Sequence, residues 1–481
     1  MPQAPRLESP AEGYEINVLK INLNFTNFVI MEATSTQGRA IFATKIGAVA
    51  TTVGSAVGLG NIWRFPYEAG VHGGGAFMIC YLFFVFIIGI PLLMAEFLMG
   101  RGTRTNVFGA YRKLSQKGRW DLFGTLGIVA SLLIISFYAV VAGWTAEFCL
   151  ASISGELNFA TTEARHEGFV QLTSGGNSVV WTLIFLAFNF LILVGGVTKG
   201  IERASNILMP VFFLLLVAFC VNSFFLPGFS QGIKYLFQPD FSKITPSVIL
   251  GALGQAFFSL SLGLGCMMTY ASYFSERNRL GKTAATTAFL DTLVAILAGV
   301  IIFPAVFSFG VSPEAGPTLV FEVLPHIFAQ LPGGMIWSTL FFLLLFLASL
   351  TSTVSMSEIS ISYFCEEKGL SRNKSVVISS LIAVFGAMLC ALSFGVFSDF
   401  TIFGMNFFNL FDYVSSNICL PLGGMGCSIF VGWFVKRNFI KDQLTDNGAF
   451  KFRLLGCLVF FLRWICPVAI FLVFLNSIGV I

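Results

Sequence analysis

Charged residues are scarce in this chain of 481 residues. Asp, Glu, Lys and Arg make up 11% of it, whereas about 25% is usual in a soluble globular protein. Hydrophobic residues make up 56%, and the mean hydropathy is +0.84. So few charges cannot cover a water-facing surface of this size, which indicates that most of the surface faces lipid. The composition argues against a secreted domain, a cytosolic enzyme and a nucleic-acid-binding protein, and the net charge of +4 is too small to favour nucleic acid.

Redox and nucleotide-binding motifs are also missing. The ten cysteines include no CxxC pair and lie mostly in apolar runs, so we interpret them as packing residues and not as a disulfide framework. The three histidines, His72, His166 and His326, lie near span ends or in loops, whereas a haem in the membrane needs histidines at mid-span. Because there is no Walker A motif, any transport would draw on an ion gradient and not on ATP.

Long apolar runs, in contrast, are abundant. A helix needs about 20 apolar residues to cross a bilayer, and closed barrels show short alternating strands instead. The sequence therefore predicts an all-α polytopic membrane protein. About eleven stretches qualify as spans: 46–70, 76–98, 122–148, 178–197, 205–226, 246–274, 284–310, 335–364, 375–397, 402–434 and 454–478.

The connections between these spans differ in basic residues. Alternate connections hold 19 lysines and arginines, and the intervening ones hold three. The positive-inside rule places the basic connections in the cytoplasm. The N-terminus is then cytoplasmic, and an odd number of spans leaves the C-terminus outside. The basic connections are 99–121, 198–204, 275–283, 365–374 and 435–453.

Two of the spans carry glycine-rich interruptions. The first has GSAVGLGN at 54–61 and the sixth has SLSLGLG at 259–265. Glycine weakens a helix interior by about 1 kcal/mol relative to alanine, so unwinding the helix there costs little free energy. Spans one and six begin two successive five-span sets, and the odd number of crossings inverts the second set. Interrupted spans at matching positions of two inverted repeats indicate the binding site of a transporter.

An unwound stretch at mid-membrane frees backbone groups that lipid cannot satisfy. Carbonyls and the hydroxyls of Ser55, Ser259 and Ser261 suit a hard cation such as sodium, and half-helix N-termini suit a carboxylate. One break can therefore hold both a cation and an amino acid's carboxylate. The alternative is close helix packing through the small-xxx-small pair of Gly54 and Gly58, which the match between the two spans disfavours.

Five ionisable residues fall at membrane depth, where charges are functional candidates. Arg64 and Asp412 should both lie on the outer side of the membrane centre, where they could pair across the path by which a substrate enters. Glu96 is interpreted as a structural residue that holds a helix end in place. Asp291 and Glu358 also require partners, because an unpaired buried charge costs several kcal/mol.

The first break belongs to a longer motif, GSAVGLGNIWRFP at 54–66 with GGGAF at 73–77, which closely resembles the first-span signature of the neurotransmitter:sodium symporters. The stretches 199–203, 255–263 and 350–352 resemble further motifs of that family. The resemblance runs from about residue 39 to 478, and the eleven spans fit a shorter bacterial subgroup of leucine and hydrophobic amino-acid transporters.

The resemblance implies a fold of two inverted five-helix repeats with broken helices one and six. We expect one transporter domain at 39–478, and residues 1–38 as a cytoplasmic segment without a signal peptide. Met31 is an alternative start, which would make 1–30 a mis-annotated extension. The domain divides into repeat one at about 39–226, repeat two at about 246–434 and an extra helix at about 454–478.

Carried over position by position, the resemblance implies two sodium sites and one amino-acid site. The sodium that contacts the substrate would be bound by Ala56, Asn61, Ser259 and Asp291. The second sodium would be bound by Gly54, Val57, Ala348, Thr351 and Ser352. The substrate would be bound by Ser55, Ala56, Gly58, Leu59, Gly60, Tyr138, Phe258, Ser259, Ser261, Leu264, Ser352 and Met356. The gates would be Arg64 with Asp412 outside and Arg39 with Glu366 inside.

Three positions depart from the family pattern. Ser259 and Leu264 stand where relatives often carry threonine and phenylalanine, and a leucine leaves room for a bulkier substrate. Asp291 stands where many relatives carry asparagine. Chloride-dependent relatives balance the sodium charge with a bound anion, so a fixed carboxylate here implies chloride independence.

These expectations combine into a sodium-coupled symporter that imports a hydrophobic or aromatic L-amino acid by alternating access across a bacterial inner membrane. Its partners would be the amino acid and the lipid bilayer, with no nucleic acid, and the sequence leaves the oligomeric state open. It would not be an enzyme. One alternative is a membrane sensor that binds an amino acid without transporting it, and another is an ion channel, which the two gates disfavour.

Overall fold

A computed structural model of the chain describes residues 40–115, 118–157, 162–276, 278–310, 312 and 319–480. The predictions for residues 1–38, for Met31 and for the inner-gate residue Arg39 lie outside the described residues.

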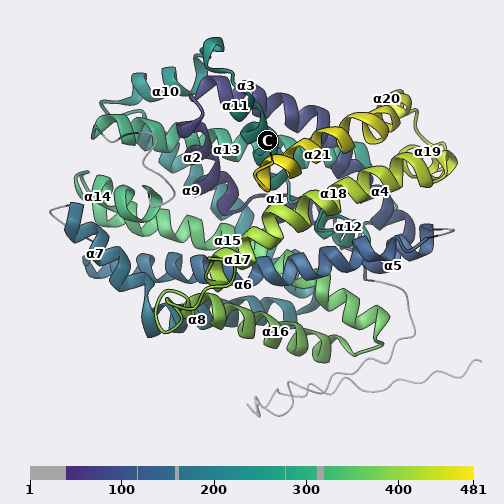
Figure 1. Cartoon of the computed structure of the whole chain (residues 1–481), viewed down its shortest axis with the longest axis horizontal. Helices are drawn as coiled ribbons and strands as arrows, with labels where there is room; N and C mark the ends of the chain where they lie inside the picture. The colour runs from purple at the N-terminus through teal and green to yellow at the C-terminus, as the bar shows by residue number, and fades with distance from the viewer. Residues whose placement is uncertain are drawn as a thin grey trace, which may run out of the picture. The chain divides into compact units, whose positions relative to one another are not determined.

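Membrane-spanning helices dominate the described part of the chain (Figure 1). Nine helices there are long and apolar enough to cross a membrane, and a bent pair, α1 (Lys45–Ala56) with η2 and α2 (Gly60–Val71), adds a tenth. The predicted span 246–274 forms two shorter helices, α11 (Pro246–Ser259) and α12 (Cys266–Ala271). The nine are α3 to α4 (Gly75–Thr103), α6 (Asp121–Ser154), α8 (Gly175–Val194), η4 to α9 (Gly196–Ser223), α13 (Leu280–Ser308), α15 (Gly334–Glu367), α16 (Arg372–Leu392), α17 to η8 (Phe407–Phe434) and α20 to α21 (Leu455–Ser477).

Each of the eleven predicted spans therefore corresponds to one of these segments, and the all-α prediction is confirmed. The shorter helices lie in the connections. They are α5 (Val107–Leu114), α7 (Thr162–Thr173), α10 (Phe229–Phe237), η5 (Phe241–Lys243), η6 (Leu319–Val323), α14 (Leu324–Ala329) and α19 (Arg437–Thr445).

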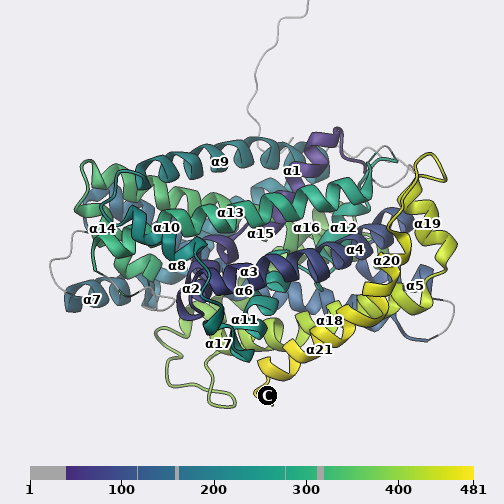
Figure 2. The same ribbon diagram turned by 90° about the horizontal axis from the view of Figure 1, so that it is seen from above.

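The core of the bundle surrounds α1. This helix packs against α9, α13 and α15 (Figure 2). Helix α15 in turn packs along α6, and both of these helices have 34 residues. The outer faces of the spans remain apolar: Phe86, Leu214 and Phe385 are 73%, 70% and 68% exposed. Large apolar side chains exposed along such long helices are expected of spans that face lipid.

The start of α1 is anchored by a distant carboxylate. Glu202 accepts hydrogen bonds from the Ala43 and Thr44 amides at 2.8 and 3.1 Å, and a negative charge is favourable at a helix N-terminus. Thr44 also caps the helix by accepting the Gly47 amide at 2.8 Å. A side chain at Gly47 would collide with Glu202, so the glycine permits this close contact.

Both predicted interruptions are present. Helix α1 ends at Ala56, Val57 adopts extended φ and ψ angles of −68° and 117°, and the two halves of the span meet at 51°. Helix α11 ends at Ser259, and α12 begins only at Cys266. Between them Gly263 has a φ of +86°, and a Cβ there would lie 2.4 Å from the Leu420 carbonyl oxygen, so only glycine fits.

Candidate functional site

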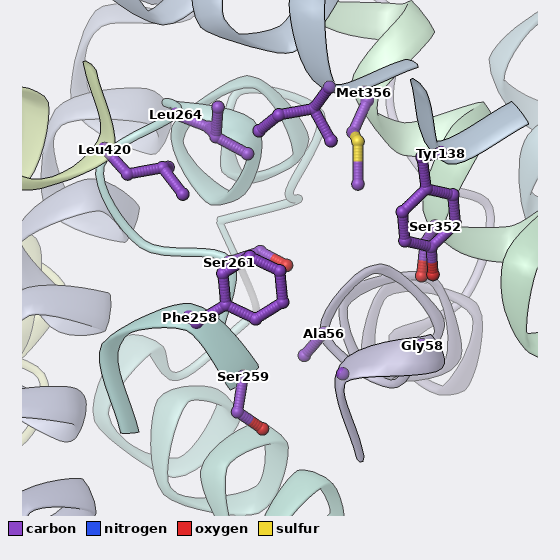
Figure 3. A pocket seen from close by; sticks show the side chains of 12 residues that line it. Ala56, Gly58, Tyr138, Phe258, Ser259, Ser261, Leu264, Ser352, Met356 and Leu420 are labelled. Atoms are coloured by element: carbon purple, nitrogen blue, oxygen red, sulfur yellow. The ribbon is translucent and has the colours of Figure 1, made fainter. Parts of the chain in front are cut away.

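The two breaks face each other and are hydrogen-bonded together. The Ser261 hydroxyl donates to the Ser55 carbonyl at 3.2 Å, and the Gln255 amide donates to the Gly60 carbonyl at 3.1 Å. A cavity of about 30 Å³ lies between them (Figure 3). It is lined by Ala56, Gly58, Gly60, Ile134, Tyr138, Phe258, Ser259, Ser261, Leu264, Ser352, Met356 and Leu420.

One end of this cavity adjoins a buried polar cluster. Asp291 accepts hydrogen bonds from the Asn61 amide at 2.7 Å and from the Ser259 hydroxyl at 2.6 Å. The Asn61 amide also lies 3.0 Å from the Ser259 hydroxyl oxygen. Asn61 and Asp291 are both 0% exposed. Among the described residues, the hydrogen bonds to this carboxylate come from the neutral groups of Asn61 and Ser259, so a cation beside it would balance its charge.

The residues predicted for the second sodium lie where α1 packs against α15. The Ser352 hydroxyl donates to the Val57 carbonyl at 3.0 Å, and the Thr351 hydroxyl donates to the Ala348 carbonyl at 3.1 Å. A Cβ added at Gly54 would lie 3.3 Å from the Thr351 Cβ, so these two residues are in contact. Carbonyl and hydroxyl oxygens gathered in this way suit a hard monovalent cation.

The backbone of the first break is held by Tyr138. Its hydroxyl accepts the Leu59 amide at 2.9 Å, while the Gly58 amide donates to the Asn61 side chain at 3.0 Å. A Cβ at Gly58 would lie 2.7 Å from the Ser352 hydroxyl oxygen and 2.8 Å from the Tyr138 hydroxyl oxygen. A side chain at position 58 would therefore fill the space in which a substrate carboxylate could meet Tyr138.

The opposite end of the cavity is apolar. Leu264, Met356 and Leu420 gather there, away from Ser259 and Ala56 (Figure 3). Ile134 and Leu420 also line the cavity but were not predicted from the sequence. Ile134 lies four residues before Tyr138 on α6, so helical spacing could have identified it. Leu420 comes from α18 (Leu420–Ile429), and no sequence motif marks it.

Two predicted substrate residues occupy other places. The Ser55 hydroxyl, in the last turn of α1, donates to the Ser355 hydroxyl at 2.9 Å and lies 3.1 Å from the Cys266 sulfur, and Ser55 does not line the cavity. Leu59 lines a larger cavity on the other side of Phe258. The Ser55 carbonyl and the Leu59 amide, in contrast, are backbone groups of the first break, and the predicted role of Leu59 uses this amide.

This larger cavity, here called the vestibule, has a volume of about 570 Å³. Gly60, Tyr138 and Phe258 line both cavities, so the two adjoin and Phe258 stands between them. The vestibule is lined mainly by aromatic side chains, and its charged lining residues are Arg64, Glu68 and Asp412.

The expected outer pairing of Arg64 with Asp412 is not formed in this conformation. Among the described residues, Arg64 pairs with Glu68, with Nε 3.5 Å from Oε1, and its guanidinium carbon lies 4.4 Å from the Phe258 ring centroid. Asp412 accepts the Ser416 hydroxyl at 2.7 Å. The prediction missed Glu68, which lies one helical turn from Arg64, on the same helix face and within reach of the guanidinium.

The other ionisable residues at membrane depth have protein partners. Glu358 is fully buried and binds Arg372 through two contacts of 2.6 Å, and it accepts the Tyr273 hydroxyl at 2.6 Å. Glu96 accepts the Gly263 and Met268 amides at 2.8 and 3.3 Å, which satisfies backbone donors freed by the second break.

The predicted inner gate can be described only in part. Glu366 accepts hydrogen bonds from the Asn106 backbone and side-chain amides at 2.8 and 3.0 Å. Its predicted partner Arg39 lies outside the described residues. Arg372, which was not predicted as a partner of Glu358, is the first residue of α16, directly after the short connection from α15, and it reaches back to the preceding span.

Comparison with known proteins gives a consistent answer. The model of the sodium:neurotransmitter symporter family matches residues 39–169 and 165–481. The uncharacterized sodium-dependent transporter YhdH of Bacillus subtilis is 38% identical over 441 residues, which cover 92% of this chain and 98% of the relative. An uncharacterized sodium-dependent transporter of Haemophilus influenzae is 35% identical and covers 92% of this chain and 99% of its own length.

A solved structure supports the same assignment. The crystal structure of MhsT in complex with L-phenylalanine superimposes with a TM-score of 0.83 at 40% sequence identity, covering 92% of this chain and 100% of MhsT. The similarity thus extends over nearly the whole transporter domain, including both broken spans. The chain belongs to the sodium:neurotransmitter symporter family and is a sodium-dependent membrane transporter.

Proposed function

We propose that the protein imports a hydrophobic or aromatic L-amino acid together with two sodium ions. The observation that carries this proposal is the cavity between the two breaks, which has a polar end beside Asp291 and an apolar end at Leu264 and Met356. An amino acid matches both ends, since its charged backbone groups and its apolar side chain point in opposite directions. MhsT, which is similar along almost its entire length, binds L-phenylalanine.

The same geometry suggests how sodium and substrate bind together. One sodium would lie among Ala56, Asn61, Ser259 and Asp291, in contact with the substrate carboxylate. That carboxylate would also accept from the Leu59 and Gly60 amides and from Tyr138. The second sodium would lie among Gly54, Val57, Ala348, Thr351 and Ser352, and the substrate ammonium would meet carbonyls near Ala56, Phe258 and Ser261.

Access to the inner cavity requires movement of Phe258. A cavity of about 30 Å³ holds about one water molecule, so an amino acid cannot enter while the Phe258 ring keeps its present position. Substrate would arrive through the vestibule, displace Phe258, and be enclosed when Arg64 and Asp412 meet above it. The inner half of span one would then swing, and Arg39 would separate from Glu366.

The proposed transporter has a defined orientation in the plasma membrane. The N-terminus would lie in the cytoplasm of a bacterium and the C-terminus outside, because connections rich in lysine and arginine alternate along the chain with connections that have few of them. The transporter domain, with repeats at about 39–226 and 246–434, would sit in the plasma membrane.

Leu264→Phe is expected to shift the preference towards smaller amino acids. The larger ring would occupy the apolar end of the cavity, beside Met356 and Leu420. In a competition assay against labelled substrate, alanine and valine should gain potency and phenylalanine should lose about 5- to 150-fold, since overpacking costs about 1–3 kcal/mol. Leu381→Phe, on the exposed face of α16, is a matched control that should behave as wild type. An unchanged profile for Leu264→Phe would remove this residue from the side-chain pocket.

Purified protein in liposomes tests the function itself. With sodium outside and potassium inside, labelled L-phenylalanine should accumulate above its external concentration, and the accumulation should vanish when sodium is replaced by potassium. Sodium-dependent binding without accumulation would favour the amino-acid sensor. A sodium current in the absence of amino acid would favour the channel. A competition screen of the twenty amino acids then identifies the substrate.

A further inference from the structure

Three side chains follow each other at four-residue intervals along the outer half of span one. Arg64 directly precedes α2 (Phe65–Val71), Glu68 lies within it, and His72 follows its last residue. Residues four apart lie on the same face of a helix. The Glu68 carboxylate therefore stands between two basic groups, with Oε1 3.5 Å from Arg64 Nε and Oε2 3.3 Å from His72 Nδ1.

His72 is itself held by other elements. Its Nε2 lies 3.4 Å from the Ser247 hydroxyl oxygen of α11, and its ring stacks on Phe77 with centroids 5.7 Å apart. A Cβ at Gly251 would lie 2.9 Å from the His72 ring, so the ring fits closely against α11. Glu68 is consequently fixed to a rigid neighbour, with a side chain only 15% exposed.

Arg64 is less restricted. Its side chain is 37% exposed and reaches into the vestibule above Phe258. Asp412, a second carboxylate of the vestibule, is engaged by the Ser416 hydroxyl. The arginine thus has two possible acidic partners in one cavity and is bound to Glu68 in the conformation with an open vestibule.

We infer that Glu68 is a positioning residue of the outer gate, which holds Arg64 away from Asp412 until sodium and substrate have bound. Closure then exchanges one carboxylate partner of Arg64 for the other, and His72 keeps Glu68 in place during the exchange. Because an ion pair exists on both sides of this equilibrium, the open and closed states stay close in free energy, and a modest differential affinity of the ligands can shift them. This inference rests on the proposed function, in which the closing of Arg64 on Asp412 encloses the amino acid.

Equilibrium binding of labelled L-phenylalanine in sodium tests the inference with Glu68→Gln, Asp412→Asn and the double variant. Removing the Glu68 charge frees Arg64 for Asp412, so Glu68→Gln should tighten binding by about two- to fivefold, as expected for a partly exposed ion pair. Asp412→Asn should weaken binding. The double variant should match Asp412→Asn, because Glu68 can act on the gate only through competition with Asp412. Glu322→Gln, which removes another extracellular-side carboxylate that pairs with a histidine, is the matched control and should bind as wild type.

Weaker binding by Glu68→Gln, or equal tightening with and without Asp412, would overturn the inference. His72→Phe keeps the stacking on Phe77 but loses the contact with Glu68, so it should tighten binding in the same direction and serves if Glu68→Gln does not fold. Alkylation of a cysteine introduced in the vestibule by Asn409→Cys gives a readout that needs no amino acid. In sodium this cysteine should be alkylated more slowly when Glu68→Gln is also present, because the gate is closed more often. An equal or faster alkylation rate would contradict the exchange of Arg64 from Glu68 to Asp412. Loss of sodium-dependent binding in the wild type would instead refute the proposed function.

Discussion

Replacement of Asp291 by serine is expected to make uptake depend on chloride. In chloride-free buffer the variant should lose at least about tenfold in uptake rate, because the carboxylate that we propose balances the sodium charge is gone. Added chloride should restore uptake in the variant, whereas the wild type should transport equally well in both buffers. Initial rates in liposomes, with gluconate replacing chloride, measure this difference.

The geometry around Asp291 explains why an anion could substitute. Asn61 and Ser259 both donate hydrogen bonds to the carboxylate at distances of 2.7 and 2.6 Å. Serine at position 291 would leave these two donors and an open space between them, which is a suitable environment for a halide ion. Asp240→Ser removes an acid of a connection between spans, whose carboxylate accepts hydrogen bonds from Ser242, and should show no chloride effect. Equal rates of Asp291→Ser with and without chloride would exclude the proposed charge-balancing role.

Glu358→Gln is expected to destabilise the protein by about 3 kcal/mol, the lower end of the range for breaking a buried ion pair. Glu358 is fully buried, and its loss of charge would leave the Arg372 guanidinium without its carboxylate partner. Thermal unfolding in detergent, followed by the amount of monodisperse protein, should show a clearly lower midpoint.

A more exposed ion pair serves as the comparison. Glu367 binds Arg112 at 2.6 Å, and the arginine side chain is 59% exposed, although the glutamate side chain is 9% exposed. Glu367→Gln should therefore change stability by less than about 1 kcal/mol. If Glu358→Gln unfolded at the wild-type midpoint, or if Glu367→Gln had the larger effect, the stabilising role of the buried pair would be wrong.

The backbone features of this protein follow from its sequence because glycine has local consequences. Three glycines at 54–60 and two at 263–265 predict the two breaks, and both are present. The apolar runs predict the spans for a similar reason, since bilayer thickness sets their length. The fold prediction is confirmed, whereas the ligand roles assigned to residues near the breaks stay predictions.

Partners of charged side chains were harder to predict. The sequence predicts Asp412 as the partner of Arg64, but Glu68 lies nearer along the helix and binds Arg64 in this conformation. Arg372, the partner of Glu358, was not identified either. A glycine-rich motif predicts where a helix is interrupted. Which of several nearby carboxylates an arginine binds depends on side-chain conformation and on whether the gate is open or closed. The sequence pattern contains no information on either.

We propose that the two facing breaks bind sodium and an amino acid in contact with each other. Equilibrium binding of labelled L-phenylalanine across a series of sodium concentrations tests it most directly. Sodium should tighten L-phenylalanine binding by about 5- to 150-fold over potassium, and L-phenylalanine should tighten sodium binding by the same factor, because coupling between two sites is reciprocal. Equal L-phenylalanine affinity in sodium and in potassium would contradict the account.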